Sequence, residues 1–158
     1  MELNIYDMAE KNMISEIKKL IKDGIDINKK NDSDCTPLYL AISNKHEDMA
    51  LELLNMGADG GIQDSNGFTD LHYAAEYGLY RVAEFILKND PNVLHIENKY
   101  GNQPLMTAVH RAKRPFDMVK LFLRYGANKG HKSATGYTPF DLAKKYNVTE
   151  FTKLFEGY

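Results

Sequence analysis

The chain has 158 residues, of which 43% are hydrophobic and 27% are charged, and it carries a formal net charge of -2. That composition excludes a disordered or fibrous chain, and a single cysteine, Cys35, excludes an intramolecular disulfide. No apolar run approaches the roughly 18 residues of a transmembrane helix, and the first residues lack the basic and apolar regions of a signal peptide. We therefore expect a cytoplasmic protein without membrane contact.

The charge is distributed unevenly along the chain. Residues 1–80 carry 15 acidic and 7 basic side chains, whereas residues 81–158 carry 7 acidic and 13 basic side chains. Such a difference is compatible with an ordinary solvated surface. It is equally compatible with a long-range field that orients a partner of mixed polarity, and the sequence leaves both interpretations open.

The first predicted unit, residues 1–30, begins within a helix and is followed by a second helix. In that second helix Ile14, Ile17, Leu20 and Ile21 recur at helical spacing, and lysines occupy the other positions. One apolar face and one charged face are what the terminal unit of a stacked array requires. We therefore expect residues 1–30 to be an N-terminal cap.

A repeated pattern follows. "TPLYLA" starts at Thr36, "TDLHYAA" at Thr69, "QPLMTA" at Gln103 and "TPFDLA" at Thr138, at offsets of 33, 34 and 35 residues. Threonine is a favoured helix N-cap and proline suits the first helical position, so each pattern predicts a helix start. A second apolar set and then, in several units, a glycine follow, which predicts helix–turn–helix units of a solenoid.

Asp70 stands where the other units have proline. A carboxylate in the first turn of a helix interacts favourably with the helix dipole, by roughly 0.3–1 kcal/mol. We expect Asp70 to be a tolerated substitution of this kind rather than a functional residue.

The last predicted unit, residues 133–158, places Phe151, Leu154 and Phe155 on one helix face and polar residues on the other. We expect it to be a C-terminal cap. The predicted protein is then one complete domain over residues 1–158, with units at about 1–30, 31–63, 64–97, 98–132 and 133–158.

The repeated unit resembles the ankyrin repeat family. Residues 64–90 match most of that family's pattern, at Asp64, Gly67, Thr69, Leu71, His72, Ala74, Ala75, Gly78, Val82 and Leu87. The resemblance covers essentially the whole chain. It implies an all-α ankyrin-repeat solenoid of stacked helix-turn-helix units with short β-hairpin loops, and a binding scaffold rather than an enzyme.

The sequence offers no catalytic, cofactor or metal site. The five histidines show no metal-ligand spacing, and His72 lies where the family uses histidine for structural hydrogen bonds. No phosphate-binding glycine loop or nucleophile elbow occurs, and Cys35 has no basic neighbour to activate its thiol. We expect no enzyme activity and no cofactor.

In the ankyrin family the hairpin tips and the exposed face of the first helices line a concave groove. The matching positions here are rich in aromatic residues and arginine, the types enriched in binding hot spots. An alternative is that some of these rings pack along the ridge between units. The predicted partner-binding residues are Phe68, Tyr77, Tyr100, Asn102, His110, Arg111, Lys113, Arg114, Tyr137 and Tyr146.

The turn between the two helices of the fourth unit is longer than in the third and carries Arg111, Lys113 and Arg114. A basic tip of this kind is suited to phosphate contact, but no continuous basic stripe accompanies it. We expect this turn to steer an acidic protein partner rather than to bind nucleic acid.

These observations predict a monomeric, non-catalytic module that binds a folded protein through its concave face. A small free-standing ankyrin protein rich in lysine and asparagine also resembles bacterial toxin immunity proteins, which implies a stoichiometric inhibitor. Two alternatives remain open: a secreted effector that captures a host protein, and a structural or assembly protein without a discrete partner.

Overall fold

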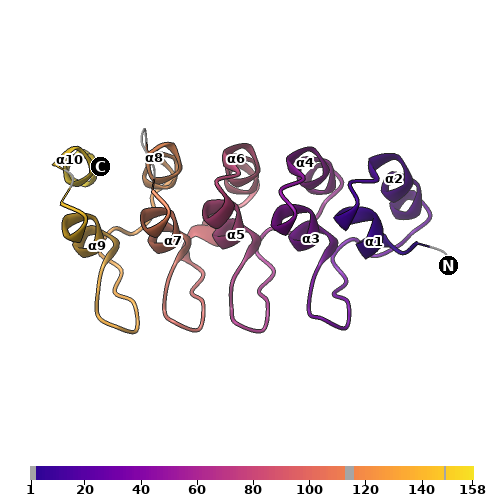
Figure 1. Cartoon of the computed structure of the whole chain (residues 1–158), viewed down its shortest axis with the longest axis horizontal. Helices are drawn as coiled ribbons and strands as arrows, with labels where there is room; N and C mark the ends of the chain where they lie inside the picture. The colour runs from indigo at the N-terminus through magenta and orange to yellow at the C-terminus, as the bar shows by residue number, and fades with distance from the viewer. Residues whose placement is uncertain (1–2, 113–115, 148) are drawn as a thin grey trace.

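The computed structural model describes residues 3–112, 116–147 and 149–158, and within these residues it contains helices and no strand. The helices form two rows, with the odd-numbered helices in one row and the even-numbered helices in the other (Figure 1). The odd-numbered helices contact one another in order along the array. The helices are α1 (Ile5–Glu10), α2 (Ile14–Lys22), α3 (Pro37–Ser43), α4 (Glu47–Asn55), α5 (Asp70–Tyr77), α6 (Tyr80–Asn89), η1 (Pro91–His95), α7 (Pro104–His110), α8 (Asp117–Arg124), α9 (Pro139–Lys145) and α10 (Thr149–Glu156).

Threonine caps start three of the odd-numbered helices. The hydroxyl oxygen of Thr36 accepts a hydrogen bond from the backbone N–H of Tyr39 at 3.1 Å, and that of Thr138 accepts one from Asp141 at 3.0 Å. Thr69 makes the equivalent cap on α5. Each cap satisfies a backbone donor that the first turn leaves unpaired, which confirms the predicted helix starts.

The core lies between the two rows and continues from unit to unit. In α5 the inward positions are Leu71, Ala74 and Ala75, which are all buried. Small alanines allow close approach of neighbouring odd-numbered helices, while the larger apolar side chains come mostly from the second helix of each unit. The large side chains with less than 2% exposure include Ile17, Met49, Leu53, Leu87 and Phe122.

Four finger loops, residues 31–35, 64–68, 98–102 and 133–137, project from the odd-numbered row (Figure 1). The expected β-hairpin loops contain no strand in the described residues, because each finger is closed by a tight turn and by a single backbone hydrogen bond between its two ends. That bond runs from the first N–H to the last carbonyl, as from Asp64 to Phe68 at 2.9 Å. In the first three of these loops the side chain of the first residue, Asn31, Asp64 or Asn98, also accepts two backbone N–H groups from its own loop.

Neighbouring fingers approach each other closely. The backbone N–H of Lys99 donates to Asn66 at 2.8 Å, and that of Ala134 donates to Tyr100 at 2.9 Å. Gly67 and Gly101 lie beside these bonds with positive φ angles of 79° and 66°. A Cβ atom at Gly101 would lie 2.9 Å from the backbone nitrogen of Ala134, so this approach requires glycine.

The third unit closes differently from the others. The segment after α6 forms the 3-10 helix η1, which begins after Asp90. The carboxylate of Asp90 accepts a hydrogen bond from the backbone N–H of Asn92 at 2.9 Å, and Val93 and Leu94 are buried. The third unit therefore ends in a capped apolar turn rather than in a glycine-ended loop.

Asp70 differs from the expectation. Its side chain is only 3% exposed, and its Oδ2 atom receives no hydrogen bond from the described residues. Burial raises the pKa of Asp70 well above its usual value, and the nearby carboxylates of Asp59 and Asp64 raise it further. The carboxyl group is therefore disfavoured as an anion, and the predicted helix-dipole interaction does not describe it.

Replacing Asp70 by proline should stabilise the fold. Proline occupies the same buried first helical position in α3, α7 and α9, and Thr69 before it already has the extended backbone that proline requires. Removal of a buried carboxyl group without a partner should raise the free energy of unfolding by about 1–3 kcal/mol at pH 7. Urea titration of the two proteins measures this difference.

The gain should depend on pH. Because the folded state keeps the Asp70 proton where the unfolded chain has lost it, the wild type loses stability as pH rises above about 4. The advantage of Asp70→Pro should therefore be smaller at pH 4 than at pH 7. Asp70→Asn is the matched control, because it removes the titration but keeps a polar side chain. A destabilised Asp70→Pro protein would show that the carboxyl group has a stabilising partner.

Candidate functional site

The predicted partner-binding residues lie on the surface formed by the finger loops and the odd-numbered helices, here called the finger face. Tyr100, Tyr137 and Tyr146 are exposed by 51%, 58% and 43%, and His110 and Arg111 are also exposed. Phe68, Tyr77 and Asn102 are half-buried. Lys113 and Arg114 lie outside the described residues.

An aromatic cluster spans the second, third and fourth units on this face. The ring of Tyr73 lies 4.8 Å from that of Tyr39 and 5.6 Å from that of Phe68, between centroids. Phe68 lies 6.3 Å from Tyr100, and Tyr77 stacks on Tyr73 at 6.4 Å. These separations are typical of favourable aromatic pairs. Phe68 therefore packs between units as well as bordering the face, whereas Tyr77 stacks within its own helix.

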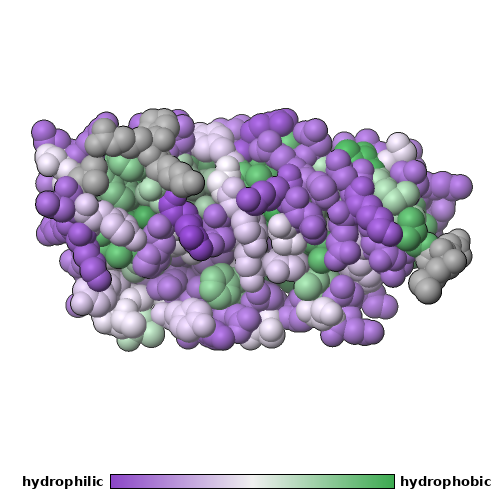
Figure 2. Space-filling view, viewed as in Figure 1, coloured by the Kyte–Doolittle hydropathy of each residue, from purple (hydrophilic) through white to green (hydrophobic). Residues whose placement is uncertain are grey.

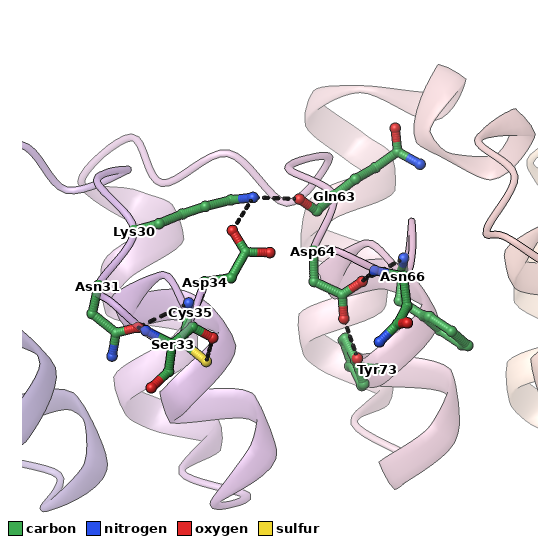
Figure 3. Close-up of polar contacts among 10 residues, drawn as sticks. Lys30, Asn31, Ser33, Asp34, Cys35, Gln63, Asp64, Asn66 and Tyr73 are labelled. Atoms are coloured by element: carbon green, nitrogen blue, oxygen red, sulfur yellow. Dashed lines mark hydrogen bonds and ion pairs between the residues drawn. The ribbon is translucent and has the colours of Figure 1, made fainter.

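Tyr39 and Tyr73 were not among the predicted residues. The sequence signal that was available is the spacing of Tyr73 and Tyr77, four residues apart on one helix. The hydroxyl of Tyr73 donates to Asp64 Oδ2 at 2.5 Å, and burial together with this carboxylate raises the pKa of Tyr73 (Figure 3). Asp64 thereby ties its finger loop to α5.

A second polar link joins the first two fingers. The ammonium of Lys30 contacts Asp34 Oδ1 at 2.9 Å and donates to the backbone carbonyl of Gln63 at 2.7 Å (Figure 3). The hydrogen bond from Lys30 lowers the pKa of Asp34. Both side chains are partly exposed, so this link positions the loops more than it adds stability.

A cleft of about 330 Å³ opens on the finger face between the fourth and fifth units. Met106 is buried and Leu142 is half-buried, while Tyr100 and Tyr137 are exposed. This set combines apolar groups with a few polar ones, as ligand pockets do. The full lining, here called the finger cleft, is Tyr100, Asn102, Met106, His110, Ser133, Thr135, Tyr137, Leu142 and Lys145.

His72 positions one part of this cleft. Its Nδ1 accepts the backbone N–H of Thr69 at 3.1 Å, and its Nε2 lies 3.0 Å from the backbone carbonyl of Asn102. Nδ1 is thus the acceptor and Nε2–H the donor, which is the neutral ring. His72 holds the fourth unit's finger loop against the third unit, and it has the structural role implied by the family resemblance.

Arg111 and His110 are held by neighbours. The guanidinium of Arg111 pairs with Glu76 of the preceding unit, so part of its charge is already compensated. His110 Nδ1 lies 3.3 Å from the hydroxyl of Tyr146 in the next unit. Partial burial and then the charge of Arg111 lower the pKa of His110, so its ring is neutral near pH 7.

One face of the molecule can be described by its hydropathy (Figure 2), and it is largely hydrophilic. On the face drawn in Figure 2, strongly hydrophobic surface is confined to separate small areas. Within residues 3–112, 116–147 and 149–158, no group of three or more His, Cys, Asp or Glu side chains is placed to hold a metal ion. None of the helices in the same residues combines the length and apolar character that a membrane span requires.

Comparison with known families agrees with this architecture. The family profile described as ankyrin repeats (3 copies) matches residues 5–95, and the profile described as ankyrin repeats (many copies) matches residues 71–123. The chain belongs to the ankyrin repeat family. Ankyrin repeats are protein–protein interaction modules and generally form a binding scaffold, not the catalytic part of the proteins that contain them.

Individual relatives differ widely. The chain is 28% identical over 165 residues to the tyrosine-protein kinase HTK16 of Hydra vulgaris, with 100% of this ankyrin chain but 21% of that kinase covered. It is 33% identical over 110 residues to the nuclear factor NF-kappa-B p105 subunit of Rattus norvegicus, with 70% of this chain and 11% of that protein covered.

A bacterial relative is the phosphocholine transferase AnkX of Legionella pneumophila, at 28% identity over 127 residues, with 78% of this chain and 13% of that enzyme covered. The ankyrin chain therefore spans about a fifth or less of the length of these three relatives.

Acidification should destabilise the fold through His72. Burial lowers the pKa of His72 from 6.5 to about 4, so between these values the unfolded chain binds a proton that the folded chain does not. The contribution is fully present above pH 6.5 and is lost as pH falls through 4. The stability lost in this way amounts to about 3 kcal/mol. The measurement is the free energy of unfolding as a function of pH.

The variant His72→Asn isolates the pH-dependent contribution of His72 to stability. Its lost hydrogen bonds should make it less stable than the wild type at pH 7, and the difference should shrink toward pH 4 because the variant has no titrating ring. A difference that stays constant between pH 7 and pH 4 would contradict a neutral, buried His72.

Proposed function

We propose that this ankyrin chain is a non-catalytic module that binds a folded protein partner through its finger face, and that it acts as a stoichiometric inhibitor of the toxin-immunity kind. The observation that carries the binding site is the finger cleft. Three exposed tyrosines lie in or beside it, on a molecule whose visible hydrophobic surface is otherwise scattered.

Tyrosine is suited to such a site because it offers a large apolar ring, a polar tip and little conformational freedom to lose. The rings of Tyr100 and Tyr137 project from neighbouring finger loops, and backbone hydrogen bonding between those loops sets their spacing. A partner therefore meets a preorganised pair of rings, which lowers the entropic cost of association.

An inhibitor needs only to cover a working surface of its partner. The finger face continues from the finger cleft into the aromatic cluster of Tyr39, Phe68, Tyr73 and Tyr77. A face that spans four of the five units offers a broad contact area, in keeping with the size of stable protein interfaces. This breadth supports occlusion of a partner's active surface as the mode of action.

The test begins with the partner that co-purifies with the tagged chain from the cells that encode it. Tyr100→Ala and Tyr137→Ala should each raise the measured dissociation constant about thirtyfold, which is a loss of about 2 kcal/mol of binding free energy. Losses of this size are common when an aromatic anchor is removed from an interface. Melting temperatures should stay close to wild type, because both rings are more than half exposed.

Tyr158→Ala is the matched control, since Tyr158 is exposed by 49% and does not line the finger cleft. Full affinity of stable Tyr100→Ala and Tyr137→Ala proteins would move the binding site off the finger face. For the inhibitor role, one equivalent of the chain should abolish the partner's own activity. A saturated partner that stays fully active would exclude inhibition and leave the binding role intact.

A further inference from the structure

The finger cleft has an uneven charge. Its lining includes the cation of Lys145 and no carboxylate. Lys145 is exposed at the C-terminal end of α9, and it makes no ion pair or hydrogen bond within the described part of the chain. Since His110 is neutral near pH 7, Lys145 supplies the only formal charge among the described residues of the lining.

Three other described cations near this face already have contacts. Lys99 donates to Asn66 Oδ1 at 2.6 Å and lies 5.1 Å from the ring centroid of Tyr100. Arg111 pairs with Glu76. Lys144, next to Lys145, lies 4.2 Å from the ring centroid of Phe140 instead. Among the described residues that line the finger cleft, Lys145 is thus the cation that a partner's carboxylate can neutralise without breaking an existing contact.

The size and lining of the cleft indicate which apolar group of a partner it can hold. A volume of about 330 Å³ is at the lower limit for ligand pockets and too small for a large cofactor. It accommodates one large side chain against Met106 and Leu142. Asn102, Ser133 and Thr135 provide polar groups around this apolar floor, suited to hydrogen bonds with a peptide backbone.

We infer that the finger cleft receives one large apolar side chain of the partner protein and that Lys145 pairs with a carboxylate on the adjacent partner residue. This inference rests on the proposed function and specifies its chemistry. The wider charge distribution agrees with it, because residues 81–158, which contain the cleft, carry 13 basic against 7 acidic side chains. Complementary charge would raise the association rate as well as select the partner.

The test uses short blocked peptides as probes and the methyl resonance of Met106 as the reporter. The probes are N-acetyl-Phe-Glu-amide, its Phe-Gln counterpart and its Ala-Glu counterpart, titrated at low ionic strength into the full chain. We expect the Phe-Glu probe to bind about threefold to fivefold more tightly than Phe-Gln, the range of an exposed ion pair. The Ala-Glu probe should leave the Met106 resonance unchanged.

Lys145→Gln should abolish the preference for Phe-Glu and leave the affinity for Phe-Gln unchanged. Lys144→Gln is the matched control and should retain the preference. Equal affinities of Phe-Glu and Phe-Gln for the wild type would overturn the carboxylate pairing, while the aromatic anchor and the proposed function would stand.

Two further results would overturn the inference in other ways. If neither phenylalanine probe moves the Met106 resonance, the cleft is not an anchor pocket. The proposed function then depends separately on the Tyr100 and Tyr137 variants. If the Met106 resonance moves with protein concentration in the absence of any probe, the occupant is a second copy of this chain.

Discussion

The contact between neighbouring finger loops sets the geometry on which the finger face depends. The third and fourth finger loops each donate one backbone hydrogen bond to the loop before them. These bonds run from Lys99 to Asn66 and from Ala134 to Tyr100. These bonds need glycine at Gly67 and Gly101, because a side chain there would collide with the next backbone. Once the spacing is fixed, the rings of Phe68 and Tyr100 meet and the finger cleft has a defined width.

Local rules predicted the parts of this structure that depend on a few neighbouring residues. Threonine caps, prolines at first helical positions and glycine-ended helices follow from short-range sterics and hydrogen bonding. Tyr100 and Tyr137 were expected on one face because both lie in finger loops, although Tyr137 shares its loop position with Phe68 and Tyr100 lies two positions earlier in its own loop. Sequence could not show the cleft itself, because its floor is formed by Met106 and Leu142 of two different units.

Two misjudged residues show where local reasoning fails. Asp70 was assessed by its helix position alone, whereas its burial is created by neighbouring residues outside that turn. Tyr39 occupies the position, three residues after the cap, that the buried His72 fills in the next unit, yet its ring packs toward Tyr73. The same register position therefore holds different chemistry in adjacent units, and only the packing between units distinguishes them.

The way the units join also bears on how quickly the chain can fold. The hydrogen-bonded residues Lys99 and Asn66 are 33 positions apart in the sequence, and Ala134 and Tyr100 are 34 positions apart. Each unit needs only its neighbour, so loop closure never spans the whole chain. A low contact order of this kind favours rapid folding that nucleates in one pair of units and spreads toward both termini.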